Sequence, residues 1–206
     1  VGLIGSSMAH AMRRAGLAGH IAGYAHTPEI VERARKIGFA DSIHGDVAAC
    51  VKDADLVVLA APVGAFAEIA KEMAPALKSG AIVSDTGSVK SAVMRDVAPP
   101  LPKGVHLVPA HPIAGTEQSG PEAGFPELFD GRWCILTPAS DADPAAVAKL
   151  KTFWERLGSQ VEMMDAKHHD LVLAITSHVP HLIAYNIVGT ANHLEQVTKG
   201  EVIKYS

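Results

Sequence analysis

The feature that most constrains this chain is a regular alternation between short apolar runs and helix-forming segments. The run Leu56–Pro62 is apolar at every position, as is typical of a strand buried on both faces of a parallel sheet. Helix start signals follow such runs, with Thr27 before Pro28 and Asp143 before Pro144. Strands that alternate with helices predict a doubly wound, mostly parallel α/β sheet of the Rossmann type.

The same reading gives the expected elements. We expect strands at 20–24, 56–62, 81–86, 106–108, 133–136 and 160–164. We expect helices at 8–16, from 28 onward, at 65–77 and from 144 to 158.

From about Ala166 the pattern changes to helix alone, with a stop signal at Lys199–Gly200. The most apolar long window, 171–191, contains His178, Pro180, His181 and Asn186, so it predicts a buried helix rather than a membrane span. Pro180 lacks an N–H for the carbonyl of Thr176, so the helix should kink or restart there. We therefore expect two domains, 1–165 and 166–206.

Composition excludes several classes of protein. The chain has 206 residues, a formal net charge of −4 and no basic run, so nothing points to nucleic acid or to an anionic membrane surface. Cys50 and Cys134 lie far apart and form no Cys-x-x-Cys motif, which fits a reducing cytoplasm rather than a disulfide framework.

The chain opens on Gly2-Leu3-Ile4-Gly5-Ser6, which has the spacing of the last two glycines of a dinucleotide-binding G-x-G-x-x-G motif. Gly2 would let the backbone approach a pyrophosphate, and Gly5 would let the helix pack closely on the sheet. A lone G-x-x-G is otherwise a common helix start. The first glycine and its strand would precede Val1, so we expect the natural protein to begin earlier.

The end of the second expected strand should select the cofactor. An acid there usually binds the ribose of NAD, but this chain has Ala25, His26 and Thr27 and no arginine for the 2′-phosphate of NADP. NAD and NADP both stay open, with a slight lean to NAD. Ala61 and Pro62, at the end of the next strand, are also predicted to contact the cofactor.

The stretch Pro109–Gly120 follows another expected strand and begins with His111. A histidine at the carboxyl end of a strand, followed by hydroxyl, acid and amide groups, is suited to a small-molecule site in an α/β sheet. The alternative is a histidine that caps the strand and binds a backbone carbonyl.

Four stretches together resemble the prephenate/arogenate (cyclohexadienyl) dehydrogenases of tyrosine biosynthesis. They are 2–7 (GLIGSS), 85–90 (DTGSVK), 111–120 (HPIAGTEQSG) and 177–181 (SHVPH). The resemblance covers nearly the whole chain. It implies an NAD(P)-binding domain, a helical domain that dimerises, and an active site between them.

The resemblance also implies roles for individual residues. His111 would be the catalytic histidine on the ring hydroxyl, and Ser88 the hydroxyl that orients it. Thr116 and Glu117 would lie at the substrate mouth. His181, with His178, would reach the substrate from the second domain. The family's arginine for the substrate carboxylate would lie beyond Ser206.

Simpler interpretations stay open for several of these residues. Ser88 could cap the next helix, and Glu117 could be a solvated loop acid or a gate. His178 and His181 could be a core pair or, with His168 or His169, a metal site, although no familiar zinc spacing is present and we predict none.

The predicted function is therefore NAD(P)-dependent oxidative decarboxylation of prephenate, arogenate or both, by a homodimer. Two alternatives come from other classes: a noncatalytic NAD(P)-binding regulator of the same fold, and a metal-dependent hydrolase that uses the histidines. The presence of both His111 and Ser88 argues against the regulator.

Overall fold

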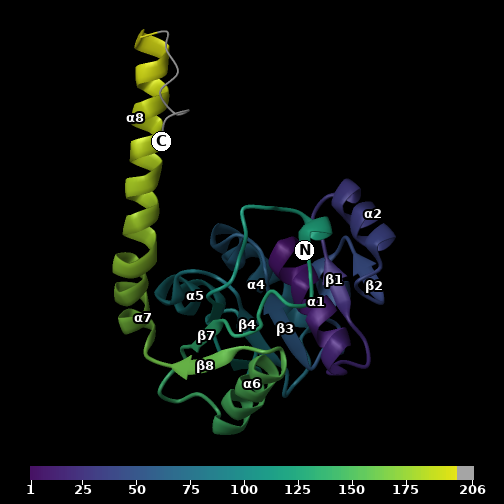
Figure 1. Cartoon of the computed structure of the whole chain (residues 1–206). Helices are drawn as coiled ribbons and strands as arrows, with labels where there is room; N and C mark the ends of the chain where they lie inside the picture. Colours follow the sequence, from purple (N-terminus) through teal and green to yellow (C-terminus); the bar gives the residue numbers. More distant parts are fainter. Residues whose placement is uncertain (199–206) are drawn as a thin grey trace.

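The computed structural model describes residues 1–198. Its strands form three small sheets, ordered β1-β2, β3-β4-β5 and β6-β7-β8 (Figure 1). The strands are β1 (Ala22–Tyr24), β2 (Ser42–His44), β3 (Leu56–Leu59), β4 (Ile82–Asp85), β5 (His106–Leu107), β6 (Ala110–Pro112), β7 (Trp133–Leu136) and β8 (Gln160–Met163). All neighbouring strands are parallel except β6 and β7, which confirms the predicted α/β fold.

Helices lie between the strands and cover the sheets (Figure 1). They are α1 (Leu3–Ala15), α2 (Pro28–Ile37), α3 (Val47–Val51), α4 (Phe66–Met73), α5 (Lys90–Val97), α6 (Pro144–Arg156), α7 (Ala166–Leu173) and α8 (Val179–Thr198), with short 3₁₀ turns at Val63–Ala65, Ala74–Ala76 and Pro121–Ala123. The expected caps are present. Thr27 Oγ1 accepts a hydrogen bond from Ile30 N–H at 3.3 Å, and Asp143 Oδ1 accepts one from Ala145 N–H at 3.1 Å.

The hydrophobic core of this domain is built on both sides of the sheets. On one side Trp154 of α6 packs edge-on against Phe129, with ring centroids 5.4 Å apart. On the other, Phe66 and Met73 of α4 are fully buried with Val83 of β4. This packing fixes the carboxyl ends of β3 and β4, which border the site described below.

The strand expected at 106–108 is divided in the structure. The chain leaves β5 after Leu107 and enters β6, which pairs antiparallel with β7, so His111 is opposite Ile135 inside a strand. The prediction that His111 follows a strand end was therefore wrong in detail. Beyond β5, the backbone N–H and carbonyl of Ala110 bind the buried side chains of Asp85 and Lys90.

The C-terminal helices leave the domain as a long rod, drawn from green to yellow in Figure 1. Near Pro180 the rod widens into a π turn, Ala174–His178, which is the irregularity expected there. Side chains bind carbonyls along this segment: Thr176 Oγ1 donates to Val172 O, and His181 Nδ1 donates to Ser177 O, each at 2.8 Å.

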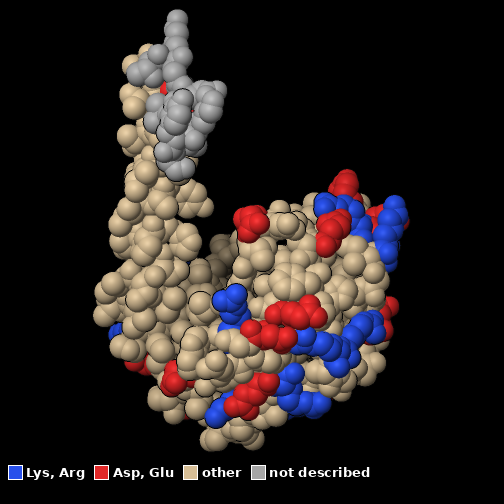
Figure 2. Space-filling view, viewed as in Figure 1, with Lys and Arg blue, Asp and Glu red and all other residues tan. Residues whose placement is uncertain are grey.

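The prediction that the apolar window 171–191 is buried was wrong for this chain. Ile187 is 64% exposed and Tyr185 is 74% exposed, because no other part of residues 1–198 covers α8. Figure 2 shows the rod almost free of charged side chains, whereas the α/β domain carries both signs. By length and composition alone, the helical segment 166–195 could also cross a membrane. The expected stop at Lys199–Gly200 lies outside the described residues.

Candidate active site

A cavity of about 520 Å³ opens where α1 begins, beside the carboxyl ends of β3 and β4. Its lining joins parts of the chain that are far apart in sequence. They include Gly2, Ala61, Pro62, Ser88 and His111. Ligands of open α/β sheets bind at this edge, outside the carboxyl ends of the strands.

The α1 end of the cavity is suited to a phosphate group. Gly2 is the N-cap of α1 and supplies no side chain, and the first turn carries no acid. A Cβ added at Gly2 would meet no atom within 4 Å, so the space over the helix N-terminus is open. Backbone N–H groups and the helix dipole favour an anion there. The residues present therefore fit a dinucleotide cofactor, with Leu3 and Ile4 also lining the cavity.

Gly5 and Ser6, the other two residues of the glycine motif, pack against other parts of the chain. A Cβ added at Gly5 would lie 3.4 Å from Val1 Cγ1 and 3.5 Å from the Cβ of Ala60, at the lower limit of ordinary contact, so α1 packs closely at this glycine. Ser6 is fully buried, and its Oγ donates to the Gly2 carbonyl at 2.9 Å. Ser6 therefore supports the turn and does not line the cavity.

His111 of β6 also lines the cavity and is paired with His169 of α7. His111 Nδ1 lies 2.9 Å from His169 Nε2, and the two rings meet edge-on. Burial lowers the pKa of His111 to about 3, with the nearby Lys90, His169 and His178 acting in the same direction. A neutral imidazole can accept a proton, so His111 presents a base to the cavity.

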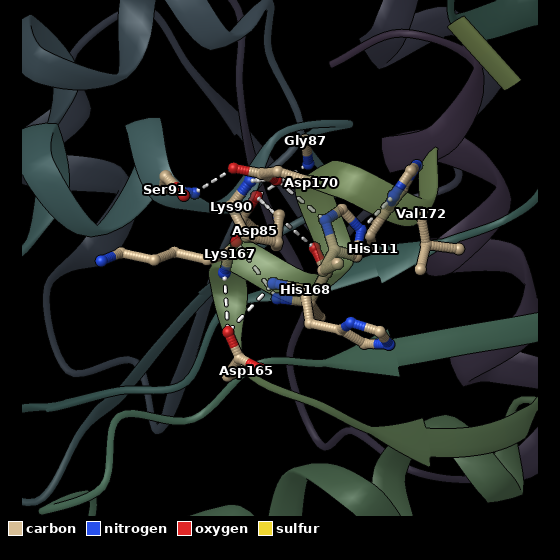
Figure 3. Close-up of polar contacts among 12 residues, drawn as sticks. Asp85, Gly87, Lys90, Ser91, His111, Asp165, Lys167, His168, Asp170 and Val172 are labelled. Carbon is tan, nitrogen blue, oxygen red and sulfur yellow. Dashed lines mark hydrogen bonds and ion pairs between the residues drawn. The ribbon is translucent and has the colours of Figure 1, made fainter. Parts of the chain in front are cut away.

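Beneath His111 lies a fully buried ion pair between Lys90 of α5 and Asp85 of β4 (Figure 3). Lys90 Nζ also donates to the Ala110 carbonyl at 2.6 Å, and Asp85 Oδ1 accepts from the Ala110 N–H at 3.2 Å. Burial raises the pKa of Asp85 and lowers the pKa of Lys90, and each charge opposes the shift in the other. Together they fix both backbone groups of the residue before His111.

The carboxylate of Asp170 joins the helical segment to this network (Figure 3). It accepts hydrogen bonds from Lys90 N–H at 2.7 Å and Ser91 N–H at 2.9 Å, and so caps α5 from outside. It also accepts from His169 Nδ1 at 2.9 Å. Burial would raise the pKa of Asp170, but these hydrogen bonds outweigh it and lower the pKa to about 2.

Comparison with known proteins decides the family. The nucleotide-binding domain of prephenate dehydrogenase matches residues 8–163, and its dimerization domain matches residues 165–206.

This chain belongs to the prephenate dehydrogenase family.

Individual members of this dehydrogenase family are closely similar to the chain. A cyclohexadienyl dehydrogenase of Zymomonas mobilis is 41% identical over the whole chain, which covers 70% of that protein. The crystal structure of prephenate dehydrogenase from Aquifex aeolicus in complex with hydroxyphenyl propionate and NAD+ gives a TM-score of 0.86 at 38% identity, covering 94% of this chain and 67% of that one.

An arogenate dehydrogenase of Synechocystis gives a TM-score of 0.80 at 27% identity, covering 92% of this chain and 66% of that one. The chain spans about half the length of other curated relatives, 53% of one and 51% of another.

Ser88 does not have the helix-capping role that was its alternative interpretation. The N-cap of α5 is Val89, with no side-chain cap, and Asp170 supplies the capping oxygens instead. Ser88 therefore does not cap the helix, and its residue lines the cavity. In the described part of the chain no hydrogen bond joins Ser88 to His111, whose Nδ1 is used by His169.

The residues predicted to select the cofactor lie outside the cavity lining. Ala25 is 1% exposed and packs in the core beneath α2, so its methyl group does not face a ribose. The hydroxyl of Thr27 is used as the cap of α2. His26 is the exposed side chain at this position.

The predicted substrate residues fall into two groups. Thr116 and Glu117 are exposed on the loop after β6, and their neighbours Gln118, Ser119 and Gly120 line the cavity instead. His178 is half-buried and close enough to lower the pKa of His111, whereas His181 is exposed and bound to its own helix. The alternative interpretation of His178 and His181 as a core pair was therefore wrong.

Sequence reasoning missed the residues that hold His111. Asp85 and Lys90 are the two ends of the 85–90 motif, and His169 and Asp170 lie near the start of the helical segment. No sequence spacing relates either pair to His111. Within residues 1–198, no three His, Cys, Asp or Glu side chains are placed to hold a metal ion.

Proposed function

We propose that this chain carries the catalytic centre of an enzyme that oxidises and decarboxylates prephenate to 4-hydroxyphenylpyruvate, arogenate to tyrosine, or both. The observation that carries the proposal is the position of His111 in one cavity with the open N-terminus of α1. The cavity can hold a dinucleotide at the start of α1 and also presents a base, which is what removal of hydrogen from an alcohol needs. The family relationship supplies the substrate class.

The cofactor would lie along Gly2, Leu3 and Ile4, with Ala61 and Pro62 on the neighbouring strand end. A nicotinamide bound there would take up the hydride from the hydroxyl-bearing carbon. His111 would accept the hydroxyl proton, because burial keeps its ring neutral at physiological pH. The carboxylates of the substrate would raise the pKa of His111 on binding, and so strengthen the base when it is needed. Loss of carbon dioxide then makes the ring aromatic.

Other residues of this chain would serve the substrate. Ser88 lines the cavity and would bind or orient the reacting hydroxyl. His178, beside His111, would contact the substrate from the helical segment. We keep Thr116 and Glu117 at the substrate mouth and His181 as a substrate contact from the helical segment. These roles require the loop after β6 and the helical segment to close over the cavity.

We further propose that the helical segment from residue 166 belongs to a second domain and that the protein acts as a soluble cytoplasmic homodimer. The exposed apolar side chains of α8 support this, since a second copy would remove them from water. The match of residues 165–206 to a dimerization domain supports it as well.

The test is turnover of prephenate and arogenate by the intact protein with NAD and with NADP. Because neither an acid nor an arginine stands at Ala25–Thr27, we expect a modest preference for NAD in kcat/KM. A preference above roughly a thousandfold, about 4 kcal/mol, would mean that a discriminating group lies elsewhere. No reduced cofactor formed from either substrate would refute the proposed function.

A further inference from the structure

In the hydrogen bonds that join His111, His169 and Asp170, the donor and the acceptor can be assigned. The carboxylate of Asp170 also accepts from two backbone N–H groups, and its pKa is lowered to about 2, so it is ionised and can only accept. His169 Nδ1, 2.9 Å from Asp170 Oδ1, must therefore carry a proton. Burial lowers the pKa of His169, and a neutral ring carries one proton, so His169 Nε2 is left as an acceptor.

The proton on His169 in turn decides which nitrogen of His111 is protonated. Its Nδ1 lies 2.9 Å from His169 Nε2, and one of the two atoms must donate. Since His169 Nε2 has no proton, His111 Nδ1 must have one. The neutral ring of His111 then has its lone pair on Nε2, the nitrogen not engaged by His169.

We propose that His169 and Asp170 are positioning residues that hold His111 in the tautomer with its proton on Nδ1, so that Nε2 is free to accept the substrate proton. The inference rests on the proposed role of His111 as the base. When Nε2 takes the hydroxyl proton, the positive charge on His111 is stabilised through the Nδ1–H to His169, and beyond it by the negative charge of Asp170. A lone buried imidazole would be found in either tautomer, and one of them presents an N–H where a lone pair is required.

The fold makes this arrangement rigid. His169 is fully buried, although it is on the first helix of the segment that leaves the domain. Asp170 is fixed by the N-terminus of α5, which also provides Lys90 beneath β6 (Figure 3). Docking of α7 on α5 thus assembles the base, so the helical segment contributes to the site besides any role in association.

The first measurement is the ring nitrogen and carbon-bound proton shifts of His111 by NMR, in the intact protein without substrate. We expect the signature of a proton on Nδ1 in the wild type. In His169→Phe, which keeps the volume and removes the acceptor, we expect a mixture of tautomers. A wild-type His111 with its proton on Nε2 would overturn the proposal, whether or not the protein turns over prephenate or arogenate.

The second measurement is kcat with saturating cofactor and substrate. We expect His169→Phe to lower kcat by roughly ten- to a hundredfold, less than loss of the base itself. His169→Gln should recover much of this, because its carbonyl can accept from His111 Nδ1 and its amide can donate to Asp170. The exposed neighbour provides the control, and His168→Gln should behave as wild type. Equal losses in His169→Phe and His169→Gln, or wild-type kcat in His169→Phe, would contradict the proposal.

Discussion

The two regions on either side of α7 differ in where their side chains find partners. Around β4, α5 and β6, a fully buried lysine and aspartate find every partner inside this chain. On α8, by contrast, large apolar side chains lie in the open, and the polar contacts of Asn186 and Thr190 are with their own helix. Residues 1–198 thus complete the polar network around Lys90 and Asp85 but leave the apolar side chains of α8 exposed to water.

Buried charges and exposed apolar side chains depend on different partners. Buried charges are costly unless they are paired at close range, so they must be paired within the folding unit. Apolar burial has no direction and depends only on area removed from water, so a second copy can supply it. Variants in each region should therefore change different quantities.

The largest effect is expected at His111, the proposed base at the end of the polar network. His111→Asn keeps a hydrogen-bonding side chain but removes the proton acceptor, so kcat should fall by about 10²–10⁴, or roughly 3–5 kcal/mol. Cofactor affinity should barely change, because the proposed cofactor site is on the backbone of Gly2, Leu3 and Ile4. Steady-state kinetics and cofactor titration measure both, with the exposed His20→Asn as control. Near-normal kcat with lost stability would make His111 a structural residue.

An effect of similar size on stability is expected at Lys90. Lys90→Met removes one partner of the buried pair and leaves Asp85 uncompensated, so the free energy of unfolding should fall by about 3–5 kcal/mol. Urea unfolding followed by fluorescence measures this. Lys103→Met, at an exposed position, should change stability by less than about 0.5 kcal/mol. If Lys90→Met is as stable as wild type, the buried Lys90–Asp85 pair does not stabilise the packing of β4, α5 and β6.

A smaller effect, on association rather than folding, is expected on α8. Burial of a side chain such as Ile187 contributes about 1.5–3 kcal/mol, so Ile187→Asp should raise the dimer dissociation constant by at least about tenfold. Sedimentation over a range of protein concentrations measures this. Met163→Asp, at an exposed apolar position of β8, is the matched control and should leave association unchanged. An unaltered dimer in Ile187→Asp would place the interface elsewhere.

The smallest effect is expected at Ser88. Ser88→Ala should lower kcat about tenfold, roughly 1.4 kcal/mol. Since Ser88 is not bonded to His111 in residues 1–198, this loss should add to that of His111→Asn in the double variant. A double variant no slower than His111→Asn would show instead that Ser88 acts by orienting the base.

Much of the first domain could be predicted from local signals. Apolar runs marked β3, β4 and β7, and the caps at Thr27 and Asp143 were found where the helices begin. These signals are readable because period and capping depend on residues within a few positions of one another. Two of the interpretations that the structure contradicts failed for the opposite reason. Burial of α8 and capping of α5 by Ser88 both depend on what packs against the helix from elsewhere.

The sequence by itself determined the alternating α/β domain, the family, and His111 as the residue to examine. Only the tertiary structure decided what surrounds His111. It brought Lys90 under β6, 20 residues away in sequence, and His169 against the ring, 58 residues away. Neither contact produces a periodic pattern in the sequence. Hydrogen bonds between different elements depend on how those elements pack and not on their spacing in the chain.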